Sequence, residues 1–184
     1  MQVTGDGQGW FNTNYAPAGE VIVRADAASI TFSGLDGYRF NSFEFYWINP
    51  LALSKRLDLR PNGIAMPAGS IMHRDQYEGA VGVREDRKDP DFTIADLTSA
   101  VADTTVQGVF FFQAFIPELA DHRRAGGEGY AIDAAVLAAD RQRLWTRLGV
   151  WKNVTDDISS QTIQTSDGSS AIKAGSRFRV FVGA

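Results

Sequence analysis

The sequence of 184 residues contains no cysteine, which excludes disulfide bonds, thiol nucleophiles and cysteine-ligated zinc. Its two histidines, His73 and His122, lie far apart and at no spacing typical of metal ligands. No apolar run approaches about 18 residues, the length that a membrane-spanning helix needs, so we expect no membrane insertion. A formal net charge of -4 offers no basic field to phosphates, so we expect no nucleic-acid partner.

Catalytic motifs are missing as well. The sequence has no GxSxG nucleophile elbow, no P-loop and no dinucleotide-binding glycine motif. A glycoside hydrolase needs two converging carboxylates, and the candidates are scattered and suited to solvent-facing positions: Glu44, Glu78, Glu118 and Glu128. We therefore predict that the chain is not an enzyme, and we expect no catalytic, cofactor-binding or metal-ligating residue. The first nine residues lack the apolar stretch of a signal peptide, so we expect a protein used without export.

Glycines are plentiful and separate short segments in which apolar and polar residues alternate, with 18 glycines against 6 prolines. Such alternation is typical of β-strands, and Phe43, Phe45 and Trp47 recur at the period of two that places them on one strand face. The predicted strands are Val21–Ala25, Ser29–Phe32, Tyr38–Ile48, Lys55–Arg60, Val106–Ile116, Arg143–Trp151, Ser160–Thr165 and Arg177–Val182.

The middle of the chain is less regular. Thr93–Ala102 is the best helix candidate, because Thr93 and Asp96 stand at the spacing of a capping box before an apolar face. Asp121–Gly129 combines charged residues with three glycines and is predicted to be a loop.

The predicted fold class is all-β: a single β-sandwich or jelly-roll-like domain over residues 19–184, with a short helical insertion. Residues 1–18 are predicted to form an N-terminal arm that carries Trp10, Phe11 and Tyr15. A glycine-rich arm cannot bury three aromatic side chains on itself, so we expect them to dock on another subunit. Packing on the outside of the same domain and ligand stacking remain as alternatives.

Both ends of the domain carry a familiar pattern. Residues 29–51 read SITFSGLDGYRFNSFEFYWINPL and are followed by LDLR, while residues 157–184 read DISSQTIQTSDGSSAIKAGSRFRVFVGA. These segments resemble a recurrent pattern in tailed-phage structural proteins, which has an Ile-x-Phe-x-Gly-Leu turn, a Leu-x-Leu-Arg strand and a closing strand that ends near glycine. The resemblance covers about a third of the chain and consists of turn and strand signatures.

The resemblance implies a jelly-roll-like virion component, assembled in the host cytoplasm and carried on a tail fibre, spike or similar appendage. Its implied partners are other virion proteins and further copies of the chain, a trimer above all. The resemblance implies no functional residue. Two alternatives stay open, a carbohydrate-binding module and, behind it, a small polysaccharide-cleaving enzyme.

One group of residues is a candidate for contact with a host surface. His122, Arg123 and Arg124 place cationic donors in the predicted loop, and Tyr130 follows it. Arginine can meet a carboxylate of an acidic surface polysaccharide with two parallel hydrogen bonds, and tyrosine offers a face to a sugar ring. A solvated linker or a contact with another virion protein are the alternative roles of this segment.

Overall fold

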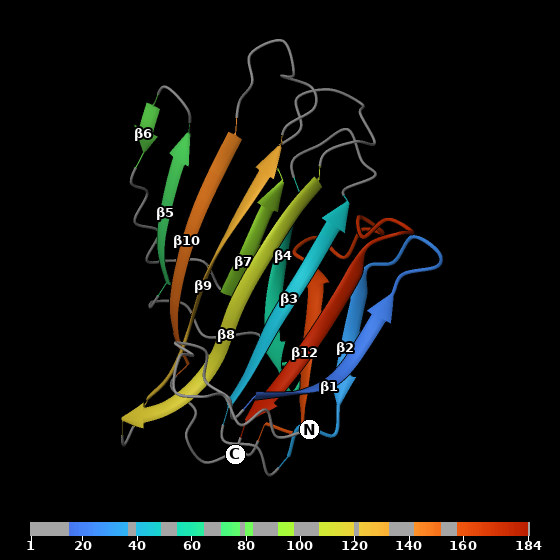
Figure 1. Cartoon of the computed structure of the whole chain (residues 1–184), viewed down its shortest axis with the longest axis vertical. Helices are drawn as coiled ribbons and strands as arrows, with labels where there is room; N and C mark the ends of the chain where they lie inside the picture. Colours follow the sequence, from blue (N-terminus) through green and yellow to red (C-terminus); the bar gives the residue numbers. More distant parts are fainter. Residues whose placement is uncertain are drawn as a thin grey trace, which may run out of the picture.

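The computed structural model describes residues 15–36, 40–48, 55–64, 71–77, 80–82, 92–97, 107–119, 122–132, 142–151 and 158–183. The regular elements in these ranges are all β-strands, as the sequence predicts (Figure 1). The strands are β1 (Tyr15–Ile22), β2 (Ser29–Ser33), β3 (Phe40–Ile48), β4 (Lys55–Pro61), β5 (Ile71–Tyr77), β6 (Ala80–Gly82), β7 (Phe92–Leu97), β8 (Gln107–Leu119), β9 (His122–Ile132), β10 (Gln142–Trp151), β11 (Ser160–Thr165) and β12 (Arg177–Gly183).

The strands form two antiparallel sheets. The large sheet has eight strands in the order β1-β12-β3-β8-β9-β10-β5-β6, and the small sheet has four in the order β2-β11-β4-β7. Strand β7, at one edge of the small sheet, contacts β8, β9 and β10 of the large sheet. The large sheet therefore extends beyond the small one on the side of β5 and β6, which lie far from β1 and β2 in Figure 1.

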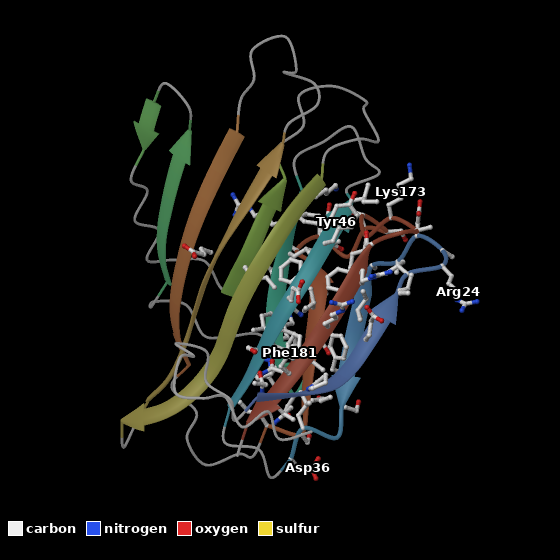
Figure 2. The ribbon with its side chains drawn as sticks, in the orientation of Figure 1. Arg24, Asp36, Tyr46, Lys173 and Phe181 are labelled. Carbon is white, nitrogen blue, oxygen red and sulfur yellow. The ribbon has the colours of Figure 1, made fainter. Side chains whose placement is uncertain are left out.

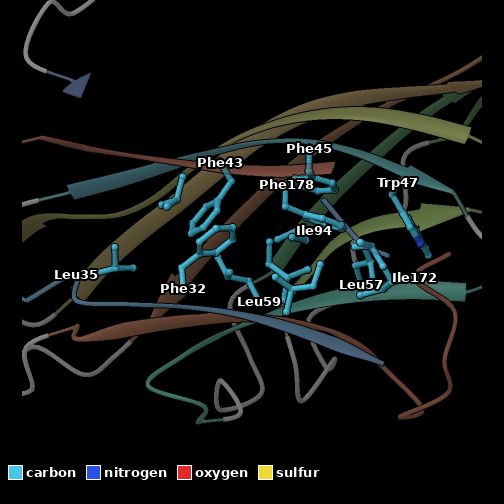
Figure 3. Packing of buried hydrophobic residues seen from close by; sticks show 14 of the residues in the cluster. Phe32, Leu35, Phe43, Phe45, Trp47, Leu57, Leu59, Ile94, Ile172 and Phe178 are labelled. Atoms are coloured by element: carbon cyan, nitrogen blue, oxygen red, sulfur yellow. The ribbon is translucent and has the colours of Figure 1, made fainter. Parts of the chain in front are cut away.

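Side chains from both sheets pack into one hydrophobic core (Figure 3). Strand β3 contributes Phe43, Phe45 and Trp47, as predicted from their spacing, and none of the three is more than 2% exposed. Phe178 of β12 stacks on Phe45, with ring centroids 5.4 Å apart. The other core residues are Val23, Ile30, Phe32, Leu35, Leu57, Leu59, Ile94, Ile163, Ile172, Val180 and Val182. Because each large apolar side chain contributes about 1.5–3 kcal/mol when fully buried, this core is the main stabilising element of the described region.

The turn predicted at Asn62-Gly63 is confirmed. Both residues have positive φ, 51° for Asn62 and 71° for Gly63, as a two-residue turn of this kind requires. The Asn62 side chain then accepts hydrogen bonds from the backbone N–H groups of Ser159 (2.9 Å) and Ser160 (3.2 Å). The turn thus links the end of β4 to the start of β11.

The helix predicted over Thr93–Ala102 is wrong for residues 93–97, which belong to β7. Strand β7 pairs with β4 from Phe92 to Leu97, and Ile94 is buried in the core at 2% exposure. Pairing with β4 satisfies the backbone groups on one side of the segment, and the β-branched Thr93 and Ile94 suit a strand better than a helix. Residues 98–102 lie outside the described residues.

The loop predicted over Asp121–Gly129 is wrong from residue 122 onward. Residues 122–132 form β9, which pairs with β8 on one side and β10 on the other. Glycine and charge lower the intrinsic strand propensity of this segment, but two flanking strands supply partners for its backbone groups. Strands β5 and β6 were not predicted from the sequence either.

Strand β1 begins at Tyr15, before the predicted first strand at Val21. Tyr15 pairs with Gly183 of β12, so residues 15–18 of the predicted arm belong to the large sheet. The register shifts between Pro17 and Gly19, and this irregularity accommodates a proline in an edge strand. Trp10 and Phe11 lie outside the described residues.

Candidate functional site

The residues predicted to contact a host surface lie on β9, and the structure does not bring them into one cluster. His122, Arg123 and Arg124 stand at the beginning of the strand and Tyr130 near its end. Tyr130 follows Arg123 by seven positions, which corresponds to about 23 Å along a strand. The arginines and Tyr130 therefore lie toward opposite ends of β9, and their contact with a surface polysaccharide stays a prediction.

A row of charged side chains instead crosses β1, β12 and β3 on the face of the large sheet opposite the core. The backbone register aligns Glu20 with Arg179 and Arg179 with Glu44. The Arg179 guanidinium donates to the Glu20 carboxylate at 2.8 Å and lies 3.9 Å from the carboxylate of Glu44. Arg177 lies 3.4 Å from Glu20. We call these four residues the outer ladder.

The outer ladder is electrically balanced, with two carboxylates and two guanidinium groups. The hydrogen bond from Arg179 lowers the pKa of Glu20, and the same bond raises the pKa of Arg179. Both groups are therefore charged throughout the neutral range, and each fixes the orientation of the other. Because the two signs cancel, the outer ladder by itself is poorly suited to attract a highly charged polysaccharide.

Two aromatic residues flank the outer ladder, Tyr46 of β3 and Phe181 of β12, and both are half-buried. Figure 2 shows Tyr46 toward one end of the face and Phe181 toward the other. Tyr46 pairs with Arg177, four residues before Phe181, so the two rings stand about 13 Å apart along the strands. Partial burial raises the pKa of Tyr46. Aromatic and arginine side chains together are the composition typical of interface centres.

A hollow of about 350 Å³ opens where the outer ladder meets Phe181. It is lined by Pro17, Ala18, Gly19, Glu20, Arg179 and Phe181. The hollow lies at the register shift of β1, a kind of irregularity that often accompanies functional sites. An aromatic ring, a guanidinium group and a carboxylate converge there, so the hollow can accept one planar group that also donates a hydrogen bond.

A second polar cluster has a structural role. Lys55, at the start of β4 with a side chain only 10% exposed, pairs with Asp167. Asp167 also accepts hydrogen bonds from the Ser169 hydroxyl (2.6 Å) and backbone N–H (3.0 Å). These bonds, that of Lys55 above all, hold the pKa of Asp167 below its usual range. The buried Trp47 indole donates to the Ala171 carbonyl at 2.8 Å, so this cluster fastens the segment before β12 to both sheets.

The carboxylates considered for glycoside hydrolysis are distributed over several strands. Glu44 pairs with Phe111 of β8, which pairs with Glu128 of β9, so two strand spacings, about 10 Å, separate the two glutamates. Glu44 lies beside Arg179 in the outer ladder, and Glu128 is exposed. Glu118 belongs to β8, and Glu78 lies outside the described residues.

Two features are absent from the part of the chain that the structure describes. No group of three or more His, Asp or Glu side chains there is arranged to hold a metal ion. Within the same ranges, no helix is long and apolar enough to cross a membrane.

Comparison with known proteins does not identify a family. No protein-family model matches the chain, and no curated protein matches it. A functional proposal therefore depends on the two terminal sequence segments and on the geometry of the outer face. The sequence contained one signal for that face, the alternation of Arg177 and Arg179 with apolar residues on the last strand. Glu20 carried no comparable signal, because its proximity to Arg179 depends on the pairing of two distant strands.

Proposed function

We propose that the chain is a structural component of a tailed-phage-like particle, located on a fibre, spike or similar appendage and assembled in the host cytoplasm. We further propose that its fold is a jelly-roll-like β-sandwich, that it has no enzymatic activity, and that its partners are other virion proteins and copies of itself.

One observation supports the proposal most strongly. The two terminal segments that resemble tailed-phage structural proteins are far apart in the sequence, yet they pair directly through β12 with β3 and through β11 with β2 and β4. Among the described core residues, only Val23 and Ile94 lie outside these two segments. The resemblance thus concerns the packed centre of one structural unit, and the unmatched middle supplies β5 to β10.

The proposal predicts that the protein is present in purified particles in a fixed number of copies. Mass spectrometry of particles purified through a density gradient should detect the chain, and cryo-electron microscopy should locate its density on an appendage. The matched control is a soluble host protein of similar abundance, which the gradient should remove. A chain found only in the soluble fraction of infected or producing cells would contradict the proposal.

A role in host attachment is a further part of the proposal. Changing Arg123 and Arg124 together to serine tests the residues suggested by the sequence, with both particle assembly and adsorption to host cells as measurements. Normal assembly with lost adsorption would support a receptor contact on β9. Failed assembly would indicate a structural contact, and no change in either would remove this segment from the attachment role.

A carbohydrate-binding module is the second candidate, and the hollow beside Phe181 favours it, because a half-buried ring next to paired charged groups can hold a sugar. Affinity electrophoresis in gels that contain laminarin, dextran or mannan tests this function directly. Retardation that Phe181→Ala removes would support it, and unchanged mobility in all three gels would contradict it.

A further inference from the structure

We propose that the hollow at the start of β1 is the docking site for the N-terminal arm of a second copy of the chain, with Trp10 as the inserted side chain. This inference rests on the self-association proposed above and names the surface that carries it. The occupant is residues 1–14, which precede the described part of the chain.

The chemistry of the hollow matches an aromatic side chain with a hydrogen-bond donor. Phe181 offers a ring for stacking, and the Arg179 guanidinium offers a cation–π contact. The Glu20 carboxylate, fixed by Arg179 at 2.8 Å, can accept the indole N–H of a tryptophan. A volume of about 350 Å³ suits one or two aromatic rings and is too small for a folded element.

The arm is the segment of this chain best suited to fill the hollow. Its two aromatic residues, Trp10 and Phe11, are adjacent and lie in a polar, glycine-rich sequence that has no means of burying them. The arm enters the large sheet at Tyr15, and the hollow begins two residues later at Pro17. The arm of every subunit therefore starts beside the hollow of that same subunit, at the edge of its large sheet.

The direction of β1 favours a neighbouring copy over the same chain as the source of the arm. The hollow lies along β1 after Tyr15, whereas an arm that continues the strand runs away from it. To reach its own hollow, the chain would have to reverse direction within Asn12–Asn14. Trp10 lies five residues before Tyr15, so an extended arm places it at most about 18 Å from Tyr15, and the second copy must pack close to this edge of the large sheet.

The test compares three forms of the full chain by light scattering over a range of concentrations. These forms are the unmodified protein, Trp10→Ala with Phe11→Ala, and Phe181→Ala. Tyr46→Ala is the matched control, because it removes a half-buried aromatic ring from the other end of the same face. Circular dichroism checks that every form is folded, and deletion of residues 1–14 provides a second way to remove the arm.

The unmodified chain and the Tyr46 control should form an oligomer, whereas the arm variants and Phe181→Ala should approach the subunit mass of 20.1 kDa. We expect the dissociation constant of the oligomer to rise at least tenfold in each of these variants. A variant that combines the arm changes with Phe181→Ala should associate no more weakly than either alone, because both changes remove the same contact. Unchanged masses would overturn the proposal. The proposal would also be overturned if the effects of Trp10→Ala and Phe181→Ala on the free energy of unfolding of a monomer were non-additive at every protein concentration. That result would indicate docking within one chain.

The same variants separate this inference from the proposed function. If particles contain the chain and the arm variants still assemble as oligomers, the arm inference fails and the proposed function stands. If the arm and Phe181 variants weaken the oligomer but purified particles do not contain the chain, the proposed function fails and the docking surface stands.

Discussion

Trp47 is the most informative single residue for the packing of the two sheets. Its side chain is completely buried, and its indole N–H donates to the Ala171 carbonyl at 2.8 Å. Trp47→Phe keeps an aromatic ring but leaves a buried carbonyl without this donor, which costs about 1–3 kcal/mol. Loss of the second ring removes buried apolar volume worth about 1–2 kcal/mol more. We expect a total loss of about 2–5 kcal/mol from the two effects together. Trp47→Ala should lose more than Trp47→Phe, because it removes the whole ring system as well as the donor.

The assay is urea unfolding followed by far-ultraviolet circular dichroism, because the substitution removes a fluorescent residue. Ile64→Ala is the control, since Ile64 is a large apolar residue that is 47% exposed, and its loss should change the free energy of unfolding by less than about 0.5 kcal/mol. A loss below about 1 kcal/mol for Trp47→Phe would refute the argument. It would mean that the segment before β12 is not fastened to β3 through the indole.

Two further predictions concern the segment before β12. Asp167→Asn should remove the stabilisation that comes from the pair with Lys55. Because that pair lowers the pKa of the Asp167 carboxyl in the folded state, the difference in free energy of unfolding from the unmodified protein should be constant above about pH 5 and shrink below about pH 4. Urea unfolding at a series of pH values measures this difference. Gly168 has a φ of 71°, so Gly168→Ala should lower the free energy of unfolding by about 1 kcal/mol. Gly19→Ala should change it by less than about 0.5 kcal/mol, because the added Cβ would meet its neighbours at an ordinary 3.6 Å. Equal losses of stability at both glycines in thermal unfolding would contradict this prediction.

The strands that the sequence predicted well share one physical property, a clean alternation between a buried and a solvated face. From Phe43 to Trp47 in β3 and from Phe178 to Val182 in β12, every second residue is apolar and buried, because one side of each strand packs on the core. Phe43 and Phe178 could be assigned to the core on this basis alone. The all-β class followed from such segments together with the glycine turns between them.

The elements that sequence analysis missed depend on their neighbours. Strand β9 has three glycines and several charges, and its pairing with β8 and β10 decides its conformation. The segment of β7 contains apolar residues at a helical spacing, yet pairing with β4 determines a strand. Strand β8 was predicted, but only the register reveals that Phe111 pairs with Glu44 whereas Phe112 pairs with the buried Phe43. Long-range pairing of this kind has no signal in a single sequence.

The candidate site was missed for the same reason and has a simple consequence for experiments. Glu20, Glu44 and Arg179 become neighbours only because β12 lies between β1 and β3. These residues face outward, and the core packs on the other side of the same strands. Phe181→Ala, in the hollow of the outer face, should therefore change association with little effect on unfolding, whereas Trp47→Phe should lower stability. If Phe181→Ala were as destabilising as Trp47→Phe, the division of this sheet into a packed face and a contact face would be wrong.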